Sequence, residues 1–383
     1  MSISMTLPSL PPAIYIAVLA SLAVALLLVL TKRWHGRFSM DGLLGIQKMH
    51  TTPTPRIGGV AIFAGVVAGW MVSAPDVAKI LGALILAGLP AFLFGLAEDL
   101  TKQVSVAARL LATMASGVLG WWMTGYSLTS VDVPLLDAVL VWAPASVLFT
   151  AFAVGGVANA VNIIDGFNGL ASGFVVVALL GLGLIAGLYG DLYLSIACLA
   201  IAASMVGFWL VNWPWGKIFL GDGGSYFGGF ALAWASVLLI ERNTNVTAFA
   251  ALLICIHPIT EVLFSIYRRR LKSMHPGHPD RLHLHSLIMR RVVSHLLLIF
   301  NGGDRHKMLA LRNPVTGLVL AMMSFPSMLA AIWLANDPVP AALGCLLFAI
   351  GYVTIYGRLV RFHWCSPIAF LFMKPVSGVA PLS

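Results

Sequence analysis

Long apolar runs alternate with short polar stretches along nearly the whole chain of 383 residues. Each run is close to the length, roughly 17–25 residues, that an α-helix needs to cross a bilayer. The pattern therefore predicts an all-α, polytopic integral membrane protein with about eleven transmembrane helices. The predicted segments are 13–30, 58–74, 79–97, 105–126, 137–158, 169–189, 192–211, 225–240, 246–266, 315–335 and 339–356.

The composition agrees with this pattern. Hydrophobic residues make up 60% of the chain, charged residues only 10%, and the mean hydropathy is +0.94. Soluble domains carry roughly 25% charged residues. We expect one integral membrane domain over 1–383, with C-terminal helices and a cytoplasmic tail over 314–383. The net charge of +9 comes from basic loops suited to anionic lipid and phosphate, and we expect no nucleic-acid partner.

Basic residues predict the orientation in the membrane. Residues 1–11 contain no Lys or Arg, whereas Lys32, Arg33 and Arg37 follow the first apolar run. Because Lys and Arg mark the cytoplasmic side, we expect an outward-facing N-terminus and an uncleaved first helix. The alternate loops 31–57, 98–104, 159–168, 212–224, 267–314 and 357–383 would then be cytoplasmic. They contain every Lys and Arg except Lys79, Arg109 and Arg242.

Several carboxylates fall on this predicted cytoplasmic edge. The stretch "GLAEDLTK" ends one apolar run with Glu98 and Asp99, and Lys102 or a divalent metal could offset their repulsion. A single acid at a helix end can simply cap the helix. However, Asp165, Asp222 and Asp280 are predicted at the same edge from other loops, and this grouping favours a functional site.

The stretch "FLGDGGSYFGG" (219–229) sets Asp222 among glycines before an apolar run. Its carboxylate is a hard oxygen ligand suited to a Mg²⁺ ion that also binds phosphates. Glycines let a backbone approach a ligand closely, and Ser225 could cap the following helix. The alternative is a glycine-rich turn between two helices without a ligand.

The stretch "NAVNIIDGFNGL" (159–170) places Asn159, Asn162, Asp165 and Asn168 at every third position. Neighbours three apart share a helical face, although all four cannot, and Gly166 is expected to break the helix. These residues would form an oxygen-rich wall at the depth of the other acids. Such a site suits a reaction between a lipid headgroup and a soluble phosphate compound.

Two basic stretches complete the candidate site. "HTTPTPRIGG" (50–59) makes Arg56 available for phosphate. "HPGHPDRLHLHSLIMRR" (275–291) supplies Arg281, His283 and His285. The two histidines could instead bind zinc, although no Cys or HExxH partner is present. The arginines that end this stretch could also lie on anionic headgroups.

These motifs, in this order, resemble the polyprenyl-phosphate N-acetylhexosamine-1-phosphate transferases of glycosyltransferase family 4, with the strongest match over 50–286. "PDRLHLHS" is similar to the branch that initiates O-antigen and enterobacterial common antigen synthesis. The resemblance implies a bacterial inner-membrane enzyme with a cytoplasmic active site. It would transfer a sugar 1-phosphate from a UDP-sugar to undecaprenyl phosphate and release UMP. Mg²⁺ would be the cofactor, with Mn²⁺ as an alternative, and a homodimer is left open.

The resemblance also implies roles for individual residues. Asp222 would hold the metal, with Asn162 as a second ligand, and Asp99 and Asp165 would lie at the reacting phosphates. Asp99 would be the base for the lipid phosphate. The residues expected to bind substrate are Arg56, Glu98, Lys102, Asn159, Asn168, Arg281, His283 and His285. Three positions depart from the family pattern: Glu98 and Asn168 replace aspartates, and Ser286 replaces a histidine.

Other interpretations stay open at this point. A transporter of a phosphorylated solute would place its polar site near the bilayer midplane, where the sequence offers Glu261 after His257-Pro258. An inactive scaffold is disfavoured because Asp99, Asp165 and Asp222 are all present. The donor is expected to be UDP-GlcNAc, with a deoxy sugar of the FucNAc or QuiNAc type as the alternative.

Overall fold

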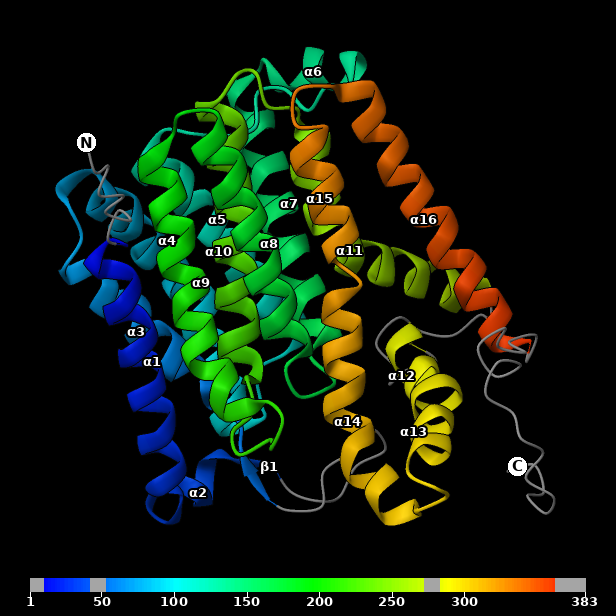
Figure 1. Ribbon diagram of the computed structural model, residues 1–383. Coiled ribbons are helices and arrows are strands. Elements are labelled where there is room, and N and C mark those ends of the chain that lie inside the picture. The colour runs from blue at the N-terminus through cyan, green and yellow to red at the C-terminus, as the bar shows by residue number, and fades with distance from the viewer. Residues whose placement is uncertain (1–9, 42–52, 272–282, 362–383) are drawn as a thin grey trace, which may run out of the picture.

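The computed structural model describes residues 10–41, 53–271 and 283–361, which form a bundle of long helices (Figure 1). Each predicted apolar segment falls largely on helix, so the predicted fold class is confirmed. The segment 137–158, however, runs across a break at residues 141–142, and the helix after this break continues to Ile164. Among these described residues, ten helical segments are long and apolar enough to cross a membrane, with α14 and α15 counting as one segment. The eleventh, α3, has only 14 residues. The long helices are α1 (Pro12–Leu30), α3 (Gly58–Met71), α4 (Pro75–Thr101), α5 (Val106–Thr124), α7 (Ala143–Ile164), α8 (Leu170–Leu188), α9 (Leu192–Asn212), α10 (Gly221–Arg242), α11 (Ala248–Leu271), α14 (Arg305–Met322), α15 (Phe325–Trp333) and α16 (Pro338–Val360).

Short elements connect these helices at the two ends of the bundle. α6 (Pro134–Leu140) lies at one end, the upper end in Figure 1. At the other end β1 (Met40–Asp41) and β2 (Thr54–Pro55) form an antiparallel pair in which Met40 faces Pro55. α12 (Leu284–Ile288), a π-helical turn (Met289–Val293) and α13 (Ser294–Phe300) precede α14 at that same end.

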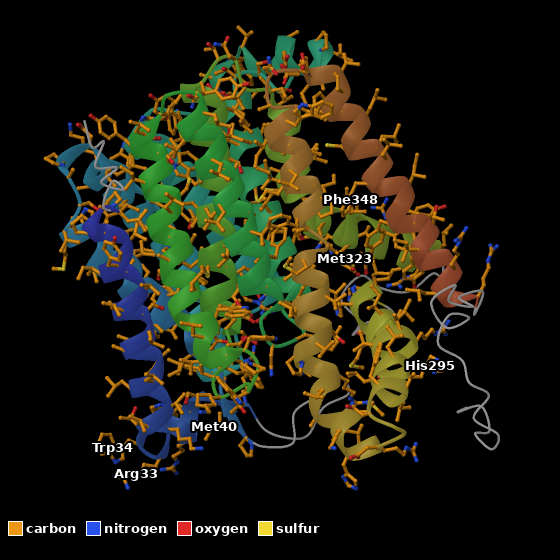
Figure 2. The ribbon with its side chains drawn as sticks, viewed as in Figure 1. Arg33, Trp34, Met40, His295, Met323 and Phe348 are labelled. Carbon is orange, nitrogen blue, oxygen red and sulfur yellow. The ribbon has the colours of Figure 1, made fainter. Side chains whose placement is uncertain are left out.

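α2 (Lys32–Ser39) has the composition of a helix that lies on a membrane surface. Trp34 and Phe38 are exposed, and Arg33 and Arg37 lie on the same short helix. Figure 2 shows Arg33 and Trp34 pointing away from the bundle at its lower edge. Aromatic and basic side chains together favour the headgroup region of a bilayer, so α2 marks the interface on this side.

α10 is the central helix of the bundle, and every residue from 221 to 239 is buried. Glycines let α3 and α4 approach its first turn closely. A methyl group on Gly59 would lie 2.3 Å from the backbone nitrogen of Gly224, and one on Gly95 would lie 2.6 Å from the backbone of Asp222. Small residues permit such close contact between membrane helices. The position of Asp222 is therefore fixed by packing against two neighbouring helices.

The expectation of a glycine turn before α10 is wrong. The helix begins at Gly221, so Asp222 and the following glycines are already helical. Ser225 does not cap the helix; it lies inside it and donates to the carbonyl oxygen of Asp222 at 3.2 Å. The sequence rule failed because glycine in a membrane bundle also serves helix packing, and composition alone does not separate the two uses.

α11 changes direction inside the bundle. Pro258 lies within the helix, and a proline there removes a backbone hydrogen bond and bends the helix. Figure 1 shows the C-terminal part of α11 running sideways toward α16. This bend brings Glu261 and Arg268 beneath the last helix, close to α12.

Candidate active site

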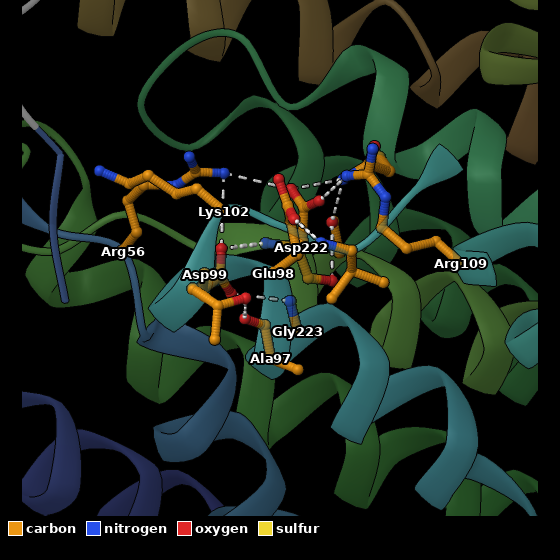
Figure 3. A network of polar contacts seen from close by, with 12 residues as sticks. Arg56, Ala97, Glu98, Asp99, Lys102, Arg109, Asp222 and Gly223 are labelled. Carbon is orange, nitrogen blue, oxygen red and sulfur yellow. Dashed lines mark hydrogen bonds and ion pairs between the residues drawn. The ribbon is translucent and has the colours of Figure 1, made fainter. Parts of the chain in front are cut away.

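The carboxylate of Asp222 is the centre of a polar cluster at the end of the bundle that carries α2 (Figure 3). Arg56 Nη2 donates to Oδ1 at 3.2 Å, and Asn162 Nδ2 donates to the same oxygen at 3.1 Å. Arg109 forms an ion pair with Oδ2. Three separate segments, the β2–α3 connection, α5 and α7, therefore direct side chains at one buried acid on α10.

Asp99, the last acid of α4, caps the first turn of α10. Its Oδ1 accepts the backbone N–H of Asp222 at 2.8 Å, and its Oδ2 accepts that of Gly223 at 2.9 Å. The first N–H groups of a helix have no partner within it, and a carboxylate there is favoured by the helix dipole. Arg56 lies 3.4 Å away from Oδ1. Since Asp99 is 1% exposed, both its oxygens serve to hold the backbone of α10.

Glu98 and Lys102 do not form the pair that the sequence suggested. Oε2 of Glu98 accepts the backbone N–H of Val104 at 2.8 Å. Lys102 ends α4 in a left-handed conformation and donates from Nζ to the carbonyl oxygen of Met40 at 3.3 Å. Glu98 therefore stabilises the α4–α5 turn. The exposed ammonium group of Lys102 lies at the edge of the cluster (Figure 3).

The four polar residues of 159–168 separate into two groups. Asn162 faces the cluster and donates to both Asp222 and Ser225 Oγ, the latter at 2.8 Å. Asn159 instead donates to Thr113 Oγ1 at 2.9 Å. Asn168 donates from its amide to the carbonyl oxygen of Pro214 at 3.3 Å. Only part of the predicted oxygen-rich wall therefore faces Asp222, and Asn159 and Asn168 brace neighbouring segments.

Asp165 directly follows the last residue of α7. Burial raises the pKa of Asp165 to about 7, and the negative charge of Asp222 raises it further, while Arg56 opposes the shift. This carboxyl group therefore belongs electrostatically to the Asp222 cluster. A carboxyl group that titrates near neutral pH can both bind and release a proton under working conditions.

The two histidines lie beside the Asp165 loop. Their rings stack with centroids 5.1 Å apart, and His285 meets the ring of Phe167 edge-on at 5.5 Å. A methyl group on Gly166 would lie 3.3 Å from Nε2 of His285. The structure therefore places this pair beside the loop that carries Asp165. Arg281 lies outside the described residues.

The residues present suit a hard divalent metal. Asp222 and Asp165 carry carboxylate oxygens, and Asn162 carries an amide oxygen that would face a metal only if the amide turned from its present contact with Asp222. Mg²⁺ prefers such oxygen donors. Within the described residues no three His, Cys, Asp or Glu side chains form a metal cluster. Mg²⁺ commonly uses only one or two protein carboxylates, with waters and substrate phosphates completing its shell. The donor set therefore fits a metal that is shared with a phosphate substrate.

Comparison with known proteins identifies the family. The model of glycosyl transferase family 4 matches residues 81–240. The chain is 30% identical to the undecaprenyl-phosphate alpha-N-acetylglucosaminyl 1-phosphate transferase of Yersinia pestis over 249 residues, which are 64% of this chain and 68% of that protein. The chain belongs to glycosyl transferase family 4. It is also 29% identical over 290 residues to the probable undecaprenyl-phosphate N-acetylglucosaminyl 1-phosphate transferase of Bacillus subtilis, which covers 76% of this chain and 77% of that protein.

The glycosyl transferase family 4 match covers only part of the candidate site. It extends from within α4 to near the end of α10 and so contains Asp99, Asp165 and Asp222. The histidine pair lies beyond it. With ten helices of spanning length in the described part of the chain, this glycosyl transferase family 4 member is a multi-pass membrane enzyme. Its acidic cluster lies within the matched region.

Two residues of the cluster and its surroundings were not predicted. Arg109 is one of three basic residues outside the predicted cytoplasmic loops, and its position in the first turns of α5 was the available signal. A charge inside an apolar helix is usually functional. Glu261 is the other. The sequence offered it only for the midplane site of a transporter, and its contact with His283 could not be read from the sequence.

Proposed function

We propose that this chain transfers N-acetylhexosamine 1-phosphate from a UDP-sugar to undecaprenyl phosphate, with release of UMP. The observation that carries the proposal is the buried Asp222, which meets two arginines and an asparagine at one end of the bundle. The names of the relatives support undecaprenyl phosphate as acceptor and GlcNAc as the sugar. A FucNAc- or QuiNAc-type donor is the alternative.

The chemistry asks for charge neutralisation and alignment. A lipid phosphate is already anionic at neutral pH, so it needs positioning against the donor more than deprotonation. Arg56 and Arg109 would neutralise the phosphates of the two substrates. Asp222 would hold Mg²⁺, with Asn162 as second ligand, and Mn²⁺ is the alternative metal. Such a metal, when bound, supplies positive charge to the diphosphate and the leaving UMP.

The two remaining aspartates receive different roles in this proposal. Asp99 has both oxygens engaged by backbone N–H groups of α10, which supports a positioning role in place of the base role implied by the resemblance. Asp165, whose pKa is raised by burial to about 7, is better suited to exchange a proton with the lipid phosphate. Lys102, His283 and His285 would bind the donor diphosphate, with Arg281 as a further candidate.

The proposed enzyme works at the inner face of a bacterial cytoplasmic membrane. Most Lys and Arg residues fall in the loops at the cluster's end, which supports a cytoplasmic active site. The product, a sugar linked to undecaprenyl diphosphate, would begin synthesis of O-antigen or another cell-envelope polysaccharide. The acids lie at one end of the bundle, which disfavours a transporter with a midplane site.

The decisive experiment incubates purified protein with undecaprenyl phosphate, Mg²⁺ and a panel of UDP-N-acetylhexosamines. The expected result is UMP release that depends on both the lipid and a donor, fastest with UDP-GlcNAc. If UMP is released only with a deoxy-sugar donor, the proposed donor would be wrong but the proposed reaction would stand. No release with any donor, from protein that purifies as a folded species, would contradict the proposal.

A further inference from the structure

Glu261 is a buried carboxylate that the proposed reaction does not use. It lies on α11, three residues after Pro258, and is 2% exposed. Burying a carboxylate is costly unless it is paired and hydrogen-bonded. The residues that meet Glu261 therefore show what its presence serves.

Three donors from two other segments converge on Glu261. Its Oε1 accepts from Nδ1 of His283 at 2.8 Å and from the backbone N–H of Leu284 at 3.3 Å. Its Oε2 accepts from the hydroxyl of Tyr352 at 2.7 Å. Glu261 thus joins the start of α12 and the last helix, α16, to the bent part of α11.

The contact with Glu261 fixes the state of one nitrogen of His283. Because Nδ1 donates to a carboxylate, that nitrogen carries a proton. A hydrogen bond to a charged acceptor is stronger than a neutral one. The His283 ring is consequently held in one orientation from its Nδ1 side.

His283 contacts the Asp165 loop through His285. Its ring stacks on His285 with an interplanar angle of 12°. His285 packs in turn on Phe167 and Gly166, which directly follow Asp165. A continuous series of contacts therefore connects Glu261 with the loop that carries a proposed reacting group.

We propose that Glu261 is a positioning residue for the donor substrate. Through His283, it holds the His283–His285 pair against the loop of residues 165–169, where the two imidazole rings can contact a nucleoside diphosphate. Tyr352 supports the same carboxylate from α16. The inference rests on the proposed function and deepens it, since it extends the donor site to a carboxylate on α11 and to the last helix.

If Glu261 only stabilised the packing of three helices, its replacement would behave differently. It would lower thermal stability and weaken the binding of both substrates to a similar extent, whether or not His283 is present. A positioning residue acts through His283, so its loss should affect the donor selectively. It should also have no further effect once the imidazole has been removed.

The test is a double-mutant cycle with Glu261→Gln, His283→Gln and the double variant. The measurement is the initial rate of UMP release, with UDP-GlcNAc and undecaprenyl phosphate varied in turn. We expect Glu261→Gln to raise KM for the donor about tenfold, the loss that follows from weakening one charged hydrogen bond. The KM for the lipid should change little, and the double variant should match His283→Gln.

Glu241→Gln is the matched control. Glu241 lies on α10 at the other end of the bundle and also accepts a backbone N–H, that of Thr129 at 2.8 Å. It should leave both KM values unchanged. Tyr352→Phe is a milder variant that keeps the carboxylate and the His283 contact. Tyr352→Phe should raise the donor KM less than Glu261→Gln does. Added to His283→Gln, it should cause no further rise, so this second cycle decides the question if Glu261→Gln does not fold.

Additive losses in these cycles, or equal rises in KM for both substrates, would overturn the inference while leaving the proposed function intact. If wild-type protein releases no UMP from any donor, the proposed function fails and the inference fails with it.

Discussion

The side chains that contact the Asp222 carboxylate come from distant parts of the sequence. Their spacing along the chain does not show that they meet. The partners Arg56, Arg109 and Asn162 lie on different segments. The sequence predicted the acid, Arg56 and Asn162 as site residues because each lies in a compositionally odd stretch. It did not predict the pairing with Arg109, which depends on how α5 packs beside α10.

The first prediction concerns the charge of Asp222. Asp222→Asn should abolish turnover in Mg²⁺, because it removes the proposed metal ligand and leaves two arginines facing a neutral amide. Membrane insertion and yield should stay normal. The measurement is UMP release by purified variant protein. Asp76→Asn, at an exposed acid paired with Lys79 at the other end, is the control and should be fully active. Near-normal activity of Asp222→Asn would move the metal site to Asp165.

The second prediction compares the neighbouring acids Glu98 and Asp99. Glu98→Asp should keep most activity, because its carboxylate accepts the N–H of Val104 in a turn and forms no hydrogen bond to Asp222. Asp99→Glu should lose most activity, since an added methylene displaces two bonds to α10 by about 1 Å, a distance that matters in active sites. Asp99→Asn should be worse still. Initial rates at saturating lipid phosphate decide the ranking, and equal losses at both positions would refute it.

The third prediction uses the raised pKa of Asp165, from 3.8 to about 7. Between these two values the folded protein binds a proton that the unfolded chain has released. Stability should therefore fall as pH rises from about 4 to about 7, with no further loss from this group above that range. Asp165→Asn should flatten this dependence.

The measurement is the thermal midpoint in detergent, without divalent metal, between pH 5 and pH 8. Asp76→Asn serves as control and should retain the wild-type slope. A slope that is unchanged in Asp165→Asn would show that another group titrates in this range.

At the scale of elements, apolar length predicted the long helices and their approximate positions. The bilayer requires runs of a minimum length, so all eleven segments could be placed from sequence. α3 falls short with 14 residues, and the breaks between α6 and α7 and between α14 and α15 were not predicted. The glycines around Asp222 were misread as a turn, because glycine marks both turns in loops and close contacts between membrane helices.

The fourth prediction tests that close contact. Gly95→Ala should reduce both thermal stability and activity, because the added methyl group would lie 2.6 Å from the backbone of Asp222. Overpacking of this kind costs about 1–3 kcal/mol, and it displaces the proposed metal ligand directly. Gly156→Ala on α7 is the matched control, since no heavy atom lies within 4 Å of the added methyl group. It should leave the thermal midpoint and UMP release unchanged, and similar losses in both variants would refute the packing argument.

At the scale of the whole molecule, the alternating direction of the described helices places all three site aspartates at one end. α4 and α7 end there, and α10 begins there. The order of the segments made this placement predictable. The route from Glu261 through His283 to the Asp165 loop was not predictable, because it depends on the bend of α11 and on its packing beneath α16.

The last prediction concerns orientation in the membrane. Among the described residues, Lys79 and Arg242 are the Lys and Arg at the end opposite the cluster, and both are bound to acids, Asp76 and Asp191. The remaining described basic residues lie at or near the cluster's end. Because such asymmetry marks the cytoplasmic side, reporter fusions after Lys374 should give a cytoplasmic signal. Fusions after Gly190, in the connection between α8 and α9, should give a periplasmic signal.

A periplasmic signal after Lys374 would mean an even number of membrane crossings and would require the topology of α14 to α16 to be redrawn. A reversal of both signals would instead place the Asp222 cluster on the periplasmic face, away from cytoplasmic UDP-sugars, and would contradict the proposed function.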